Sequence, residues 1–497
     1  MTIKRIVAIP VDPRPVVCAQ VVDLVALAGV TLTVPPAAML GHFRVAADTD
    51  ALFCWLEKQL ATADGVVLSL DMLLYGGLVP SRFSTEAAPQ IAARLARIRA
   101  LRETCDLAVP WFAFAATLRI SNNNINDEEK QYWREYGEKI WAWSYHSDRA
   151  EVTGDAGAQA RALAARGTIP SEIQEDYLAT RRRNFSMLSR AIDYLAEGIF
   201  DRLILPQDDT AGFGFNIAER RRLEARVHEA GLGERVAIYA GADEVLHTLC
   251  ARLVGAGTAP KLYVVFTDPA HVAKLTARYE DRPLLASLAA QIAAVGAERV
   301  TTQEDADVLL LVHSQGETQG DWAMRSPLAA SFAVDPPCWH ALERAQAAAQ
   351  PIAVIDLAYA NGGDRQFIDT LASRLPLGNL AAYAGWNTAG NAIGSCLAQL
   401  VVSGGGASAV DNRRIVCLRL LEDLVYQADV RQRVRAVIDE ASLSAAQLQQ
   451  AVAEKFLPVA DAWLEQHQFP WRVAGIRLPW NRTFEIDIAM RAAEGAA

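Results

Sequence analysis

The stretch RLILPQDDTAGFGFNIAERRRLEARVHEAG, residues 202–231, shows the pattern that decides the fold. It opens on a short apolar run and ends on a segment whose apolar residues recur at helical spacing, which together predict a strand followed by a helix. The turn between them contains Asp208, Asp209, Gly212 and Gly214. A strand-to-helix turn needs only a glycine and a capping residue. The additional carboxylate and the two phenylalanines therefore indicate a functional site.

The same alternation of strand and helix recurs along most of the 497 residues. Ten apolar runs predict strands, at residues 5–12, 30–36, 65–72, 111–118, 202–208, 235–243, 261–268, 307–314, 351–358 and 380–387. Most of these runs are almost continuously apolar, which is typical of parallel strands that are covered on both faces. The sequence therefore predicts an α/β protein with mainly parallel sheets and flanking helices.

The chain is too long for one ordinary core, so we expect more than one domain. Two tandem open sheets fit the strand count, one in residues 1–255 and one in residues 261–405, with the glycine-rich segments 255–261 and 403–408 as joints. We expect a helical C-terminal region over residues 406–497, with a tail at 473–488 that folds back to the site. One (β/α)8-type barrel with additions is the alternative.

A helical insertion is expected at about residues 122–200, where the strand pattern is interrupted. It contains six aromatic residues within fourteen positions, namely Tyr132, Trp133, Tyr136, Trp141, Trp143 and Tyr145. Aromatic residues at helical spacing usually belong to a core. The alternative is a cover over a substrate, because aromatic rings pack well on the apolar faces of sugars.

The composition excludes several classes of function. The net charge is -10 and Lys and Arg form no basic tract, so we expect no nucleic-acid partner. The sequence has no signal-peptide pattern and no apolar run long enough to cross a bilayer, so we expect no membrane association. Seven widely spaced cysteines without a CxxC motif predict reduced, buried thiols and a cytoplasmic location.

Common cofactor motifs are missing from the sequence. It contains no phosphate-binding GxxxxGK[ST] loop, no dinucleotide-binding glycine pattern in the right context and no GxSxG elbow. It also lacks HExxH and any tight His/Cys cluster, which disfavours zinc. We therefore expect no cofactor, with Mg²⁺ or Mn²⁺ as the alternative.

Polar residues follow most of the predicted strands, at the edge where ligands bind in α/β proteins. The candidates are Asp12, Arg14, Asp71, Tyr75, Arg82, Arg119, Asp208, Asp209, Asn216, Asp243, Glu244, His313, Asp356, Asn361, Trp386 and Asn387. Any one of them is also a good helix cap or turn residue. As a set they predict a site, because carboxylates gathered at one edge repel one another and need a ligand, a metal ion or arginines.

Two pairs of adjacent carboxylates are the catalytic candidates. Asp208 and Asp209 follow one strand, and Asp243 and Glu244 follow the next. Neighbouring strand residues point to opposite faces, so the two members of a pair converge only if the strand has ended. We expect one member of each pair to act on substrate and the other to cap a helix or to pair with an arginine such as Arg82 or Arg119.

Seven motifs together resemble a bacterial family, the domain of unknown function 4127 family. They are PVDPRP, SLDMLLYGGLVPSR, PQDDTAGFGFN, AGADEV, AYANGGD, GWNTAGN and LPWNRTFEI, and they run through nearly the whole chain. The resemblance implies no particular activity. It does imply that these loops and the tail belong to one unit, which adds Arg472, Asn481 and Arg482 to the candidates.

Three functions compete. We favour a carbohydrate-active enzyme, most simply a glycoside hydrolase with two carboxylates, acting on a small-molecule or oligosaccharide substrate. A metal-dependent sugar isomerase, lyase or hydrolase is the second, with Asp208, Asp243, His313 and Asp356 as ligands. A sugar or metabolite binding protein without catalytic activity is the third. The oligomeric state cannot be predicted.

Overall fold

The computed structural model describes residues 3–328, 333–404 and 409–493, so the predicted joint at 403–408 lies largely outside the described residues. The chain divides into two compact units. Unit 1 consists of Met1–Val22, Val30–Leu253 and Tyr279–Arg282, and unit 2 consists of Asp23–Gly29, Val254–Arg278 and Pro283–Ala497.

Unit 1 is built on a six-stranded parallel sheet in the order β2-β1-β3-β4-β5-β6. Its strands are β1 (Arg5–Ile9), β2 (Thr31–Thr33), β3 (Gly65–Ser69), β4 (Trp111–Phe114), β5 (Arg202–Ile204) and β6 (Val236–Ala237). The chain moves from β1 to β2 on one side and then to β3 on the other. The strand order therefore reverses beside β1, which is where ligands bind in open parallel sheets.

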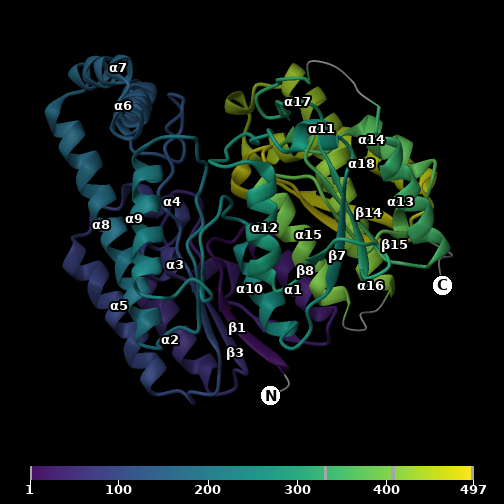
Figure 1. Ribbon diagram of the computed structural model, residues 1–497, viewed down its shortest axis with the longest axis horizontal. Coiled ribbons are helices and arrows are strands. Elements are labelled where there is room, and N and C mark those ends of the chain that lie inside the picture. The colour runs from purple at the N-terminus through teal and green to yellow at the C-terminus, as the bar shows by residue number, and fades with distance from the viewer. Residues whose placement is uncertain (1–2, 329–332, 405–408, 494–497) are drawn as a thin grey trace. The chain divides into compact units, whose positions relative to one another are not determined.

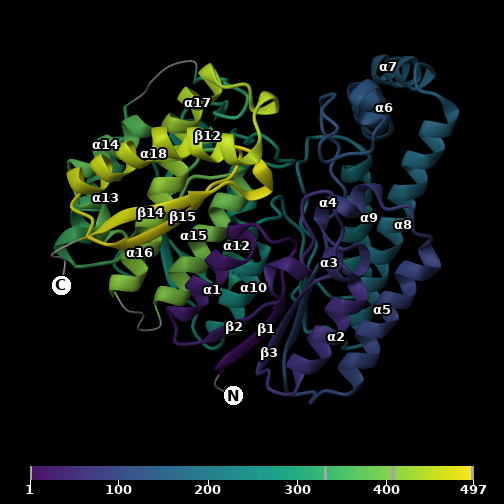
Figure 2. The same ribbon diagram turned by 180° about the vertical axis from the view of Figure 1, so that it is seen from behind.

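Helices cover the sheet of unit 1. They are α2 (Thr49–Leu60), α3 (Leu70–Tyr75), α4 (Leu78–Phe83), α5 (Ala88–Glu103), α8 (Ser171–Ala196), α9 (Phe215–Glu229) and α10 (Val245–Val254), while α1 (Ala19–Ala26) belongs partly to each unit. Two further helices, α6 (Trp133–Thr153) and α7 (Ala156–Gly167), pack on each other, and α6 also packs against α9. Figures 1 and 2 show α5, α8 and α9 side by side on one face. Val66 packs in this layer, and its neighbour Val67 is equally buried on the other face. Burial of both faces explains the continuous apolar runs.

Unit 2 contains a five-stranded parallel sheet in the order β13-β11-β9-β7-β8. Its strands are β7 (Lys261–Phe266), β8 (Glu298–Val300), β9 (Val308–His313), β11 (Ile352–Asp356) and β13 (Ala382–Ala384). Its helices are α11 (Pro269–Val272), α12 (Leu284–Val295), α13 (Pro336–Ala347), α14 (Arg365–Ala372), α15 (Ala389–Ser403), α16 (Ala409–Arg419), a π-helix (Leu420–Val430), α17 (Arg431–Val437) and α18 (Ala445–Gln466). The strand order reverses beside β7, in the same way as beside β1 of unit 1.

The C-terminal region joins the core of unit 2. A hairpin of β14 (Trp471–Arg477) and β15 (Asp487–Ala492) packs beside α18, as Figures 1 and 2 show. Its buried residues share one core with β9, β11, α13, α14, α16, the π-helix, α17 and α18. A short parallel pair, β10 (Gly320–Asp321) with β12 (Tyr359–Ala360), completes the described strands.

The predicted α/β class is confirmed, and each of the ten predicted runs contains a strand of one of the two large sheets. The barrel alternative is wrong, because both sheets are open and have edge strands. The sequence did not predict β8, which is three residues long and largely exposed at an edge. Among the described residues, no helix has the length and apolar content needed to cross a membrane. All seven cysteines are free thiols. Five are buried, as expected, but Cys54 is exposed and Cys105 is half-buried.

Candidate functional site

The strand ends of unit 1 carry the adjacent pair Asp208 and Asp209. The sheet ladder continues past β5 to Gln207, which bridges to both neighbouring segments, and it ends there. Asp209 adopts the left-handed backbone conformation, with φ of 33°. Because the strand has ended, both carboxylates reach arginines that share further acidic partners. The expectation that they point apart therefore does not apply to this turn.

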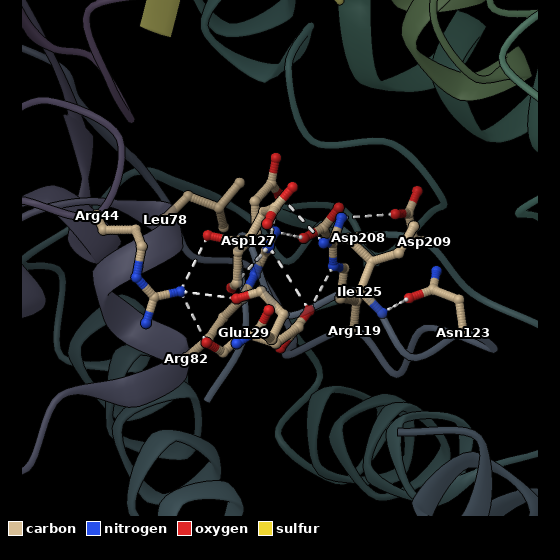
Figure 3. A network of polar contacts seen from close by, with 12 residues as sticks. Arg44, Leu78, Arg82, Arg119, Asn123, Ile125, Asp127, Glu129, Asp208 and Asp209 are labelled. Atoms are coloured by element: carbon tan, nitrogen blue, oxygen red, sulfur yellow. Dashed lines mark hydrogen bonds and ion pairs between the residues drawn. The ribbon is translucent and has the colours of Figure 1, made fainter. Parts of the chain in front are cut away.

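Two arginines organise this cluster, which Figure 3 shows. Arg82 Nη2 lies 2.6 Å from Asp208 Oδ2, and Arg119 Nη1 lies 2.8 Å from Asp209 Oδ2. Arg82 is carried by α4, and its place depends on the turn at Gly76 and Gly77 between α3 and α4, where both φ angles are positive. A Cβ on Gly76 would lie 2.8 Å from the backbone of residue 47, so only glycine fits that turn.

A loop of residues 121–131 supplies two further carboxylates that the sequence analysis did not single out. Glu128 Oε2 lies 2.8 Å from Arg82 Nη1 and 3.1 Å from Arg119 Nη2, and Glu129 Oε1 lies 2.8 Å from Arg119 Nε. Arg44 Nη1 fixes this loop by donating to three backbone carbonyls, those of residues 126, 127 and 129, at 2.8–3.0 Å (Figure 3). The sequence signal was a run of three acidic residues, 127–129, in a polar segment after a strand.

The electrostatics of the cluster favour one proton among its carboxylates. Four acidic groups face two guanidinium groups. Burial, together with the charges of Asp208 and Glu128, outweighs Arg119 and raises the pKa of Asp209 to about 6. The side chain of Asp209 is 30 % exposed, against 12 % for Asp208. Asp209 is therefore the most accessible carboxylate of the cluster, and it keeps its proton to a higher pH than an ordinary aspartate does.

Asp71 lies in the same region but is buried. Its Oδ2 accepts the backbone N–H of Ala116 at 2.9 Å. Burial raises its pKa to about 7, the negative charge of Asp208 adds to this, and Arg82 opposes it. Asp71 is 3 % exposed, so it shapes the base of the site rather than its surface.

Asp12 and Arg14 follow β1, where the strand order reverses. Arg14 lies between two carboxylates, with Nη2 2.8 Å from Asp12 Oδ2 and 2.6 Å from Asp243 Oδ1. All three side chains are buried. Burial raises the pKa of Asp243, with Arg14 opposing and the charges of Asp12 and Asp208 adding to the rise. The predicted candidates after β1, β3, β5 and β6 are thus brought into one electrostatic neighbourhood.

Three other candidates of unit 1 are placed inside the fold. Glu244 is fully buried, and burial followed by the charge of Asp243 holds its pKa far above the usual range, so it is a neutral acid. The side-chain N–H of Asn216 donates to Thr210 Oγ1 at 3.3 Å and stabilises the turn that contains both residues. Tyr75 is buried, with the guanidinium of Arg183 5.2 Å from its ring centroid.

The candidates of unit 2 form a buried polar cluster of their own. His313, at the end of β9, contacts Thr267 Oγ1 at 2.9 Å and Asp364 Oδ2 at 3.1 Å. Asp356, at the end of β11, accepts the backbone N–H of Asp364 at 2.7 Å, and burial raises its pKa to about 6. Asp364, which the sequence analysis missed, also caps α14. The contacts of His313 with the buried Thr267 and with Asp364, the cap of α14, give this histidine a structural role.

The remaining candidates of unit 2 lie near the C-terminal tail. The backbone N–H of Asn361 donates to the carbonyl of Asn387 at 2.6 Å. Trp386 is buried, and its ring lies 5.6 Å from that of Phe484 in the segment LPWNRTFEI. The tail and the end of β13 therefore meet within unit 2. Arg482 pairs with Glu485 in the same segment.

Metal binding was the alternative chemistry. Within residues 3–328, 333–404 and 409–493, no group of three or more His, Cys, Asp and Glu side chains is arranged to hold a metal ion. In unit 1 arginines occupy the positions beside the carboxylates. The cluster is therefore suited to hydrogen bonding with a polar ligand and to proton transfer from Asp209.

Comparison with known sequences places the chain in a family. No curated protein matches it. The sequence model of the family described as "Protein of unknown function (DUF4127)" matches residues 6–489, which is nearly the whole chain. The protein therefore belongs to the DUF4127 family.

Proposed function

We propose that the protein is a carbohydrate-active enzyme, most simply a glycoside hydrolase, in which Asp209 donates a proton and Asp208 stabilises the charge that develops on the sugar. One observation carries the proposal. Burial raises the pKa of three carboxylates that follow different strands, Asp71, Asp209 and Asp243, and the negative charge of Asp208 adds to each rise. A glycosidase needs such a contrast between one ionised and one protonated carboxyl group.

The reaction follows from these two roles. Asp209 gives its proton to the glycosidic oxygen as the bond to the anomeric carbon breaks. The carboxylate of Asp208 stabilises the positive charge that develops on the sugar ring. Water then attacks the anomeric carbon, gives its hydroxyl group to the product and returns a proton to the carboxylate of Asp209. Arg82 holds Asp208 in place through an ion pair at 2.6 Å.

Aromatic residues support a sugar as substrate. Phe213, which follows the two aspartates in the same turn, packs edge-on against Tyr145 of α6 at 5.6 Å. Tyr145 stacks on Trp141 at 4.8 Å, and both rings are half-buried. In contrast, Trp133 and Trp143 of the same helix are buried in a core. The partly exposed rings are suited to pack on the apolar face of a sugar.

The test is hydrolysis of a panel of chromogenic glycosides, with and without EDTA. We expect release that survives EDTA and falls strongly in Asp208→Asn and Asp209→Asn. Asp127→Asn is the matched control, because it removes an exposed carboxylate of the neighbouring loop. Release abolished by EDTA would favour a metal-dependent sugar isomerase, lyase or hydrolase using Mg²⁺ or Mn²⁺. Tight sugar binding without release would favour a binding protein.

A further inference from the structure

One carboxylate oxygen in unit 1 receives two arginines. Oε2 of Glu128 lies 2.8 Å from Arg82 Nη1 and 3.1 Å from Arg119 Nη2. Guanidinium groups that converge in this way are the usual protein receptor for a carboxylate. Glu128 comes from the loop of residues 121–131, which forms no helix or strand and whose residues are exposed or half-buried except Glu129. The receptor consists of Arg82 from α4 and Arg119 from the segment after β4, whereas its occupant, Glu128, belongs to a surface loop.

The arginines do not need Glu128 to balance their charge. Arg82 keeps Asp208, and Arg119 keeps Asp209 and Glu129. Replacing the carboxylate of Glu128 by another carboxylate leaves the net charge of the cluster unchanged. The exchange therefore costs little electrostatic energy compared with burying a new charge.

Arg44 holds the occupant from outside the receptor. Its Nη1 donates to three backbone carbonyls of the loop, and its guanidinium lies 4.2 Å from the ring centroid of Phe83. These contacts involve no side chain of the arginine pair. Arg44 therefore stabilises the closed position of the loop independently of Arg82 and Arg119.

We infer that Arg82 and Arg119 form a subsite for the carboxylate of an acidic sugar, a uronic acid residue, and that Glu128 occupies it when the loop is closed. The binding of a carboxylate follows from the geometry alone. Its assignment to a sugar rests on the proposed function.

The test measures binding of D-glucuronate and D-glucose to the full chain by calorimetry. Glu128→Ala removes the internal competitor, so we expect glucuronate to bind roughly tenfold more tightly than to the wild type, with glucose unchanged. Asp127→Ala is the matched control, because it removes a carboxylate of the same charge from the preceding position of the loop. Circular dichroism checks that each variant is folded.

Two further variants make the test specific. Arg44→Ala releases the loop and should raise glucuronate affinity without altering the receptor. Arg119→Lys added to Glu128→Ala keeps the charge but loses the planar donor group, and it should remove the gain. The inference would be overturned if Glu128→Ala did not raise the affinity for glucuronate, or if Asp127→Ala raised it equally.

The binding result is independent of hydrolysis. A gain in glucuronate affinity without cleavage of any glycoside would support the carboxylate subsite and contradict the proposed hydrolase. Cleavage of neutral glycosides that depends on Asp209, without a gain for glucuronate in Glu128→Ala, would keep the hydrolase and remove the subsite.

Discussion

Ser144 of α6 accepts a hydrogen bond from the backbone N–H of Phe215, the first residue of α9, at 2.7 Å. One turn further along α6, Asp148 accepts the N–H of Gly214 at 2.9 Å. Gly214 precedes α9 and has no side chain to cap it. The inserted helix α6 therefore caps α9 and fixes the far end of the turn that carries Asp208 and Asp209.

Replacement of Ser144 by Ala should destabilise unit 1 by about 0.5–2 kcal/mol, because the N–H of Phe215 loses its buried acceptor. Urea unfolding followed by circular dichroism measures the change. Ser186→Ala is the control, since its hydroxyl donates to the carbonyl of Arg183 within its own helix, α8. Equal effects of the two substitutions would show that the cap contributes nothing.

The proton on Asp209 predicts how activity depends on pH. Its pKa is raised to about 6, so a proton donor at this position loses activity as pH rises through that value. Glu128→Gln removes one of the charges that raise this pKa and should move the decline to lower pH. Asp209→Asn should lower kcat by about 10²–10⁴-fold. A profile of kcat against pH that Glu128→Gln leaves unchanged would argue against Asp209 as the donor.

The strands could be predicted because burial on both faces leaves a continuous apolar run, as at Val66 and Val67. The candidate site could be predicted only as a set of strand ends. The partners that organise it are remote in sequence, with Arg82 lying 126 positions from Asp208. The cap on α9 lies 71 positions before it, so the sequence around Gly214 shows a helix start without a cap.

The predicted and missed carboxylates differ in their surroundings. Asp208 follows an apolar run, which marks it as a strand end. Glu128 and Glu129 lie in a polar loop, where acidic residues are usually solvated, and nothing local distinguishes them. Their function depends on Arg44, which reaches the loop from more than 80 positions away. Contacts of this kind depend on the tertiary fold and leave no local pattern.

The pair of Arg82 and Asp208 predicts a coupled loss of stability. Only 4 % of the Arg82 side chain is exposed, and Arg82→Ala leaves Asp208 and Glu128 without this partner. We expect a cost of about 3–5 kcal/mol. Asp208→Asn added to Arg82→Ala should recover part of it, because the uncompensated charge is gone. A double-mutant cycle from urea unfolding measures the coupling, and additive effects would contradict it.

Gly363 in unit 2 predicts a steric effect close to Asp356. A Cβ at this position would lie 2.3 Å from the hydroxyl of Tyr383 and 3.0 Å from Asp356 Oδ2. Gly363→Ala should therefore lower the free energy of unfolding by about 1–3 kcal/mol. Gly475→Ala in β14 is the control, because no atom lies within 4 Å of its Cβ position. A thermal melt in which the control is the less stable variant would contradict this expectation.

Asp71 predicts how the stability of unit 1 depends on pH. Burial raises its pKa to about 7 in the folded state, whereas an unfolded aspartate has a pKa of about 3.9. The folded state therefore holds a proton that the unfolded state has lost between about pH 4 and pH 7, and stability falls as pH rises through this window, by on the order of 1 kcal/mol per unit. Asp71→Asn keeps an oxygen for the N–H of Ala116 and has no proton to lose, so its urea midpoint should fall less steeply over this window. Parallel pH profiles for the wild type and Asp71→Asn would contradict a neutral Asp71.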